Sequence, residues 1–296
     1  MKRFHGIIPP VVTPLNRDGG LDTAGLERLL AHIMEGGVHG LFILGTTGEG
    51  PSLPHAVQEQ MIRETVRLAD GRLPVFVGIS SPAFQDSLRL ARLAADCGCD
   101  ACVAAPPCYF QPGNDELIDF YASLAAAVSL PLFIYNMPSM TKVYMQPDLV
   151  VRLAEIRGVC GYKDSSANML DFHKVLLALK DRQDFSIFIG PEELLGDAVL
   201  FGADGGIAGG ANLNPRIFTG MYEAALKGDV AQMRHLQEQI YAQRSLYGIG
   251  RYQSSMIKGL KSALRQKGLC EDYLAAPFNH FEDTEAARVA EVLRAL

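Results

Sequence analysis

Short apolar or β-branched runs recur eight times along the chain, and each is followed by a longer stretch whose apolar residues repeat at helical spacing. Such alternation indicates βα units around a parallel sheet, and eight strands is the number that closes a (β/α)8 barrel. We therefore predict an α/β protein with the TIM-barrel fold, and a doubly wound open sheet is the alternative. The predicted strands span residues 6–12, 41–45, 74–79, 101–105, 132–136, 159–164, 186–190 and 205–209.

The chain is long enough for one barrel and a short addition. Its 296 residues exceed the roughly 250 of a typical barrel, and no linker or charge block divides them. After the last predicted strand, patterns typical of two or three helices follow without further strands. We predict a barrel over residues 1–225 and a C-terminal helical extension over residues 226–296, packed on the barrel as one structural unit.

Charge and hydropathy exclude two classes of partner. A net charge of −6 gives no basic surface for nucleic acid, although a local positive site for an anionic substrate is compatible with it. No apolar stretch approaches the ~20 residues that cross a bilayer, and residues 1–14 lack the pattern of a signal peptide. We therefore expect no nucleic-acid or membrane partner and a cytoplasmic location, where the six cysteines are reduced thiols.

Lys163 ends the sixth predicted strand, at the edge of the barrel where reacting groups gather. Strand alternation places Gly161 and Lys163 on one face and Cys160 on the other. If Lys163 faces inward, burial favours the neutral amine, which is the form that attacks a ketone. The alternative is a solvated lysine at a strand end.

Two further groups are expected near Lys163. Tyr135 ends the neighbouring fifth strand, and its phenol is suited to proton transfer; otherwise it is an amphipathic tyrosine that caps the barrel. The Thr46-Thr47-Gly48 turn after the second strand offers hydroxyls and N–H groups to a carboxylate. Its alternative is an ordinary loop with locally bonded threonines.

Four motifs at matching spacing give the chain a resemblance to a known family over nearly its whole length. They are Gly45-Thr46-Thr47-Gly48-Glu49, Tyr135-Asn136-Met137-Pro138, Gly161-Tyr162-Lys163-Asp164 and Gly202-Ala203-Asp204-Gly205-Gly206-Ile207. With them the chain resembles the dihydrodipicolinate synthase/N-acetylneuraminate lyase family of class I pyruvate-dependent aldolases.

The resemblance implies a role for each matching residue. Lys163 would form an imine with the substrate, and Tyr135 would act as general acid and base. Thr46 and Thr47 would bind the pyruvyl carboxylate, with Thr47 joining a proton relay. Tyr109 matches a tyrosine that completes this relay across a subunit interface, which implies a homotetramer built as a dimer of dimers. Gly190 and Ile207 match positions that line the pocket with backbone groups.

One position departs from the synthase branch of the family. That branch places an arginine, for the carboxylate of the second substrate, where this chain has Met140. A thioether cannot form the paired hydrogen bonds of a guanidinium, which argues against aspartate semialdehyde as the partner substrate. Ser165, Glu192 and Glu193 match places where the sugar-acid lyases contact substrate hydroxyls. The two glutamates are equally typical of an acidic first helical turn.

Other kinds of site find little support in the sequence. The histidines form no zinc-binding pattern and the cysteines 97, 99 and 102 lack the spacing of zinc knuckles, so we expect no metal and no cofactor. The glycines of the eighth strand lie where many barrels bind phosphate, but no lysine or arginine accompanies them. The sequence therefore gives little support to a phosphorylated substrate.

The residues together predict a Schiff-base lyase that acts on a 2-oxo acid, with a 2-keto-3-deoxy sugar acid as the favoured substrate. The same imine would serve an aldolase or a dehydratase. A dihydrodipicolinate synthase is the nearer alternative, and a non-catalytic keto-acid-binding protein is an alternative of another class.

Overall fold

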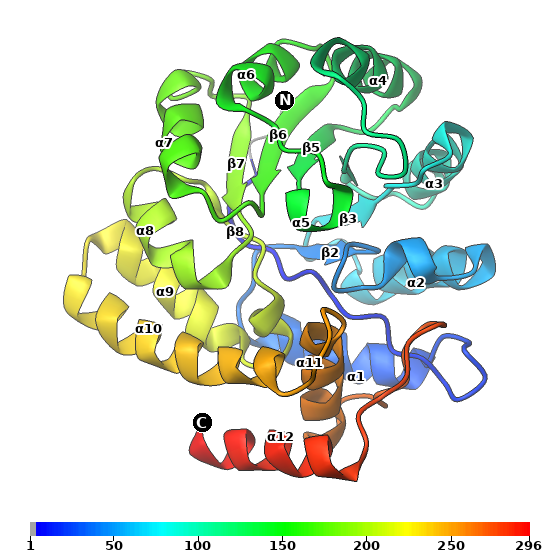
Figure 1. Ribbon diagram of the computed structural model, residues 1–296, viewed down its shortest axis with the longest axis vertical. Coiled ribbons are helices and arrows are strands. Elements are labelled where there is room, and N and C mark those ends of the chain that lie inside the picture. The colour runs from blue at the N-terminus through cyan, green and yellow to red at the C-terminus, as the bar shows by residue number, and fades with distance from the viewer. Residues whose placement is uncertain (1–3) are drawn as a thin grey trace.

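The strands form one closed parallel barrel, which confirms the predicted TIM-barrel fold (Figure 1). The structure, a computed structural model, describes residues 4–296. Its sheet has the order β1-β8-β7-β6-β5-β4-β3-β2, and a parallel bridge between Pro10 and Phe42 joins the chain after β1 to β2. The order never reverses, so the doubly wound alternative was wrong. The strands are β1 (Gly6–Ile7), β2 (Leu41–Ile43), β3 (Val75–Gly78), β4 (Ala101–Ala104), β5 (Leu132–Asn136), β6 (Val159–Asp164), β7 (Ser186–Ile189) and β8 (Gly205–Gly206).

Helices surround the barrel and extend past it at the C-terminal end of the chain. Around the strands lie α1 (Thr23–Glu35), α2 (His55–Ala69), α3 (Phe84–Asp96), α4 (Asn114–Ala127), α5 (Pro138–Thr141), α6 (Pro147–Ala154), α7 (Met169–Ala178), α8 (Leu195–Leu200) and α9 (Pro215–Lys227). The chain continues through α10 (Val230–Arg244), α11 (Ser255–Gln266) and α12 (Asp283–Ala295), which confirms the predicted helical extension. The proposed boundary after residue 225 falls in the last turn of α9. None of the helices described could reach across a bilayer.

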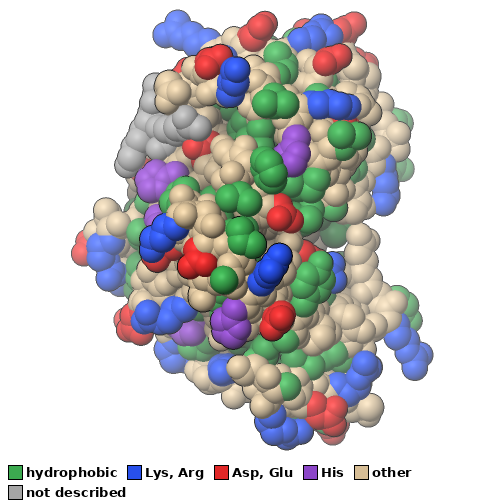
Figure 2. Space-filling model, turned by 90° about the vertical axis from the view of Figure 1, so that its left-hand side faces the viewer, with side chains coloured by type: hydrophobic (Ala, Val, Ile, Leu, Met, Phe, Trp, Pro, Cys, Tyr) green, Lys and Arg blue, Asp and Glu red, His purple; other side chains and the backbone are tan. Residues whose placement is uncertain are grey.

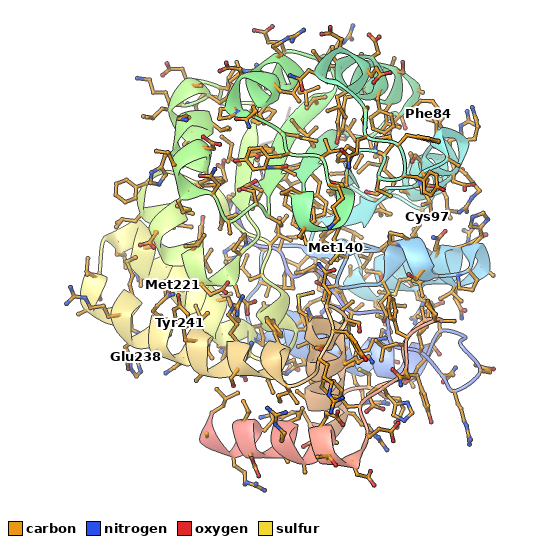
Figure 3. The ribbon with its side chains drawn as sticks, viewed as in Figure 1. Phe84, Cys97, Met140, Met221, Glu238 and Tyr241 are labelled. Carbon is orange, nitrogen blue, oxygen red and sulfur yellow. The ribbon has the colours of Figure 1, made fainter. Side chains whose placement is uncertain are left out.

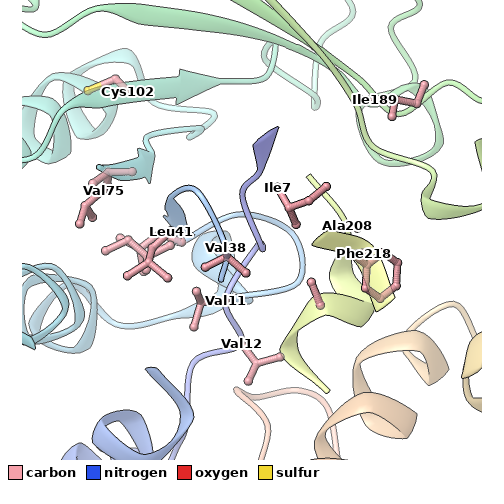
Figure 4. Close-up of a cluster of buried hydrophobic side chains, with 14 of the residues drawn as sticks. Ile7, Val11, Val12, Val38, Leu41, Val75, Cys102, Ile189, Ala208 and Phe218 are labelled. Carbon is pink, nitrogen blue, oxygen red and sulfur yellow. The ribbon is translucent and has the colours of Figure 1, made fainter. Parts of the chain in front are cut away.

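Two apolar layers give the barrel its shape. The outer layer lies between strands and helices and includes Ile7, Leu41 and Phe218 (Figure 4). The inner layer fills the barrel with large rings, among them Phe133 and Phe188. Outward and inward side chains alternate along β4 and β5, as closure of a barrel requires.

A β-bulge in β6 changes which side chains face inward. Leu132 of β5 pairs with Val159 of β6, and the next residue, Phe133, pairs with Gly161. The strand β6 therefore has one extra residue, Cys160, at this point. Cys160 therefore packs in the inner layer, and its predicted place on the opposite face from Lys163 was wrong. A Cβ atom on Gly161 would lie 2.1 Å from the Phe133 ring, so this ring occupies the space beneath Lys163.

Candidate active site

Lys163 and Tyr135 face each other at the carboxyl ends of neighbouring strands. Strand register pairs Tyr135 of β5 with Lys163 of β6, and only 3% of Lys163 and 4% of Tyr135 is exposed. The Lys163 Nζ atom lies 3.9 Å from the centre of the Tyr135 ring and 4.9 Å from that of Phe42 on β2. The lysine is thus buried, with two aromatic rings next to its amine.

Burial changes the acid–base properties of both groups. It lowers the pKa of the Lys163 amine, because removal from water disfavours the ammonium form more than the nearby Tyr135 oxygen favours it. Burial alone would raise the pKa of Tyr135, but the Lys163 ammonium and hydrogen bonds with Thr46 and Ser165 lower it. The site therefore holds an amine and a phenol in contact, each with a lowered pKa.

The turn after β2 supplies donors beside this pair. The Thr46 hydroxyl lies 3.5 Å from the Tyr135 hydroxyl, whereas the Thr47 hydroxyl lies toward Gly209. Within residues 4–296 the N–H groups of Thr46, Thr47 and Gly48 have no hydrogen-bond acceptor, so they are available to a carboxylate. The neighbour of Tyr135 is thus Thr46, where the resemblance assigned the relay to Thr47.

An ion pair that the sequence analysis missed fixes the next residue of the turn. Glu49 has a left-handed backbone (φ 56°), and its carboxylate lies 2.5 Å from the Lys261 Nζ atom of α11. Lys261 also donates to the Tyr273 carbonyl at 2.7 Å, and Glu49 accepts from the Ala275 N–H at 2.8 Å. Both side chains are buried. The C-terminal extension therefore holds the turn that carries the threonines.

Behind the lysine, a buried polar network joins β5 to β6. Asn136 donates to the Tyr162 hydroxyl at 3.1 Å and to Asp164 at 2.8 Å, and Tyr162 donates to the same Asp164 oxygen at 3.0 Å. Ser166 donates to the other Asp164 oxygen at 2.9 Å. These bonds lock the register that sets Tyr135 opposite the reactive lysine.

Ser165 and Gly190 come together next to the pair. Ser165 reaches the Tyr135 hydroxyl, and a Cβ atom on Gly190 would lie 2.1 Å from the Ser165 hydroxyl oxygen. Glycine at position 190 therefore leaves room for the serine side chain. The Gly190 N–H donates to the Asp164 carbonyl at 2.6 Å.

The remaining predicted contacts lie on the β7–β8 side, away from the cavity. The Glu192 carboxylate accepts from the Gly210 N–H at 2.7 Å, and burial raises its pKa. Glu193 forms an ion pair with Arg244 of α10. Ile207 packs in the inner layer. The structure thus gives both glutamates partners within the chain, and contact with substrate hydroxyls stays a prediction.

Tyr109 does not approach the site of its own chain. It follows β4, is 84% exposed, and makes an edge contact with Phe110 at 5.2 Å between ring centres. Its predicted role in a neighbouring subunit is compatible with this position and stays a prediction.

A cavity of about 440 Å³ opens beside Tyr135 and Thr46. The loops after β2, β3, β4 and β5 form much of its wall, and the beginning of α11 completes it. Over residues 4–296, no cluster of three or more His, Cys, Asp or Glu side chains is arranged to hold a metal ion. The arrangement suits covalent chemistry on a small anion whose carboxylate binds the β2 turn.

Known proteins of one family resemble this chain over nearly its whole length. The model of the dihydrodipicolinate synthetase family matches residues 3–296. A protein named as a probable 2-dehydro-3-deoxy-D-pentonate aldolase of Escherichia coli K12 is 33% identical over 97% of this chain and 95% of its own length. A 4-hydroxy-tetrahydrodipicolinate synthase of Alkalilimnicola ehrlichii is 32% identical over 98% of both chains. The structure of dihydrodipicolinate synthase from Bacteroides thetaiotaomicron has a TM-score of 0.96 at 49% identity and covers 99% of each chain.

Proposed function

The chain belongs to the dihydrodipicolinate synthetase family, and from that premise we propose that it is a lyase that binds a 2-oxo acid of the pyruvate type as a Schiff base on Lys163. The observation that carries the proposal is the buried Lys163, whose amine lies 3.9 Å from the ring centre of Tyr135. A lysine in this position has a lowered pKa and a proton-transfer group in contact.

The reaction follows from these positions. The neutral Lys163 amine attacks C2 of the 2-oxo acid, and loss of water gives a protonated imine that accepts electrons. Tyr135 removes the proton from the C4 hydroxyl, and the C3–C4 bond breaks to give an enamine and a free aldehyde. Thr46 is the proposed relay partner of Tyr135, because its hydroxyl is the nearer of the two threonines. The N–H groups of the β2 turn hold the carboxylate.

A 2-keto-3-deoxy sugar acid is the proposed substrate. The E. coli relative is named for such an acid, and Met140 offers no charge for the carboxylate of aspartate semialdehyde. Synthase activity is the alternative, favoured by the A. ehrlichii and B. thetaiotaomicron relatives. Pyruvate release from a panel of 2-keto-3-deoxy sugar acids, set against a coupled assay with aspartate semialdehyde, separates the two. A catalytically silent keto-acid sensor would bind ligand in the Lys163→Ala variant and turn over no sugar acid.

Borohydride reduction in the presence of pyruvate tests the covalent step. We expect one added pyruvyl group on the peptide that contains Lys163, and none in a Lys163→Arg variant. Exposed Lys180 gives a matched control, because Lys180→Arg should leave the adduct unchanged. A wild-type protein that shows no adduct at Lys163 would rule out the proposed chemistry.

We further propose a homotetramer, built as a dimer of dimers, that works in the cytoplasm. The exposed pair Tyr109 and Phe110 supports contact with a second copy, since large exposed rings are typical of interfaces. The six cysteines are all unpaired, as is usual in a reducing compartment.

A further inference from the structure

The wall of the cavity beside Tyr135 is largely apolar. Met137 and Met140 reach it from the α5 region, Met256 and Ile257 from α11, and Phe278 from the segment that follows α11. We call these five side chains the apolar wall. Figure 3 places Met140 at α5.

Charge is nearly absent from the same cavity. Among the described residues, no arginine, lysine or histidine lines it. Its one carboxylate belongs to Glu49, which is already paired with Lys261 and bonded to the Ala275 N–H. Away from the N–H groups of the β2 turn, a second carboxylate or a phosphate would lose water and gain no counter-ion, which is costly.

Some of the hydroxyls in the cavity already form hydrogen bonds with the backbone. The Thr141 hydroxyl donates to the Met137 carbonyl at 3.1 Å, and the Ser80 hydroxyl accepts from the Ala105 N–H at 2.8 Å. Hydroxyls of a ligand would find partners at Ser52, Gln253 and Ser254 elsewhere in the lining, but the side chains of the apolar wall offer them none. Aliphatic or aromatic carbon, in contrast, would bury apolar area there.

We propose that the aldehyde handled beside Tyr135 is uncharged and packs its carbon skeleton against the apolar wall. This inference rests on the proposed function and names the class of its second substrate. The class contains the short hydroxyaldehydes that 2-keto-3-deoxy sugar acids release, and it extends to aldehydes with an aliphatic or aromatic body. In the condensing direction, enamine C3 bonds to the aldehyde carbon, Tyr135 gives its proton to the aldehyde oxygen, and water then frees the product from Lys163.

Matched pairs of aldehydes test the inference with the full-length enzyme and pyruvate. Benzaldehyde is compared with 4-carboxybenzaldehyde, and butanal with 4-oxobutanoate, by the initial rate at which the aldol product of the correct mass appears. Each pair shares a skeleton and differs in one charge. We expect kcat/KM to be about a hundredfold higher for the neutral member of each pair, because the cavity offers its carboxylate counterpart no cation.

Met140 offers a gain-of-function variant. The residue is 40% exposed at the edge of the cavity, so an arginine there keeps contact with water. Met140→Arg should reduce the ratio of kcat/KM between the neutral and the charged member of each pair by about tenfold or more, since it supplies the missing counter-ion. Met140→Leu keeps the apolar wall and should retain the preference.

Borohydride trapping of pyruvate, run on every variant, separates this inference from the function on which it rests. Trapping at Lys163 with equal or faster turnover of the charged aldehydes would overturn the inference alone. Trapping with no condensation of any neutral aldehyde would also overturn it. Failure of trapping in the wild-type protein would remove the proposed function, and the inference with it.

Discussion

At the scale of single residues, the chemistry depends on where one amine is held. Lys163 would carry a charge at neutral pH in water, yet the rings of Tyr135 and Phe42 replace its hydration shell. Its environment therefore lowers the pKa of the amine and makes the neutral form more accessible than it is in water. The position is set by strand register and by the network of Asn136 with Asp164, which lies behind the lysine.

The lowered pKa of Lys163 predicts a pH dependence for imine formation. The amine becomes nucleophilic as pH rises through its folded-state pKa, so the trapping rate with cyanoborohydride should rise and then level off below pH 10.5, the ordinary value for lysine. The Tyr135 oxygen opposes this shift, so Tyr135→Phe should move the rise to lower pH. A rise centred at the ordinary value in both proteins would contradict the effect of burial.

At the scale of elements, the C-terminal extension takes part in the site. Glu49 lies in the turn after β2 and Lys261 in α11, and their ion pair is shielded from water. A buried pair of this kind is strongly destabilised when one partner is removed, because the other is left charged and alone. The threonine turn and the helix are therefore coupled.

We predict that Lys261→Met lowers the free energy of unfolding by about 3–5 kcal/mol, as measured by urea denaturation. Adding Glu49→Gln should recover part of this loss, because the second change removes the unpaired charge. Lys267→Met, at an exposed site at the end of the same helix, is the control and should have little effect. If the single and double variants lost the same stability, the two residues would not be coupled.

The sequence predicts the bounds of some elements more accurately than the positions of single side chains. The bounds of β5 and β6 match the prediction at both ends, because their apolar runs are bounded by clear turn signals. Strands β1 and β8 are shorter than predicted, since only two residues of each pair within the sheet. Cys160 was misplaced because a bulge leaves no mark in an apolar pattern.

Lys163, Tyr135 and the threonine turn could be predicted because they belong to short motifs at strand ends. Lys261 could not be paired with Glu49, since the two lie far apart in the chain and spacing says nothing about such contacts. One signal was present: Lys261 follows Ile257 by four residues and precedes Leu264 by three, which places it on the buried face of α11.

At the scale of the whole molecule, two surfaces carry large apolar side chains. Tyr109 and Phe110 project after β4. On the side formed by α7 to α10, shown in Figure 2, apolar side chains lie among charged ones, and Leu170, Leu177 and Phe201 are exposed in this part of the chain. The adjacent rings of Tyr109 and Phe110 contact each other.

Complementation between variants tests whether Tyr109 acts in a neighbouring subunit. Lys163→Arg and Tyr109→Phe should each be nearly inactive alone. Their co-expression should restore about a quarter of wild-type activity, because half of the dimers are mixed and one of their two sites is complete. An active monomer by light scattering, or mixed dimers without recovery, would show that Tyr109 does not act across the interface.

The ion pair between Glu49 and Lys261 also joins two segments that are made at different times during synthesis. The ribosome makes all eight strands of the barrel before α11, the helix that braces the β2 turn. A nascent chain that has emerged only as far as the last barrel strand would contain Glu49 without its partner Lys261. The β2 turn would then gain its buried ion-pair partner only after α11 has been made.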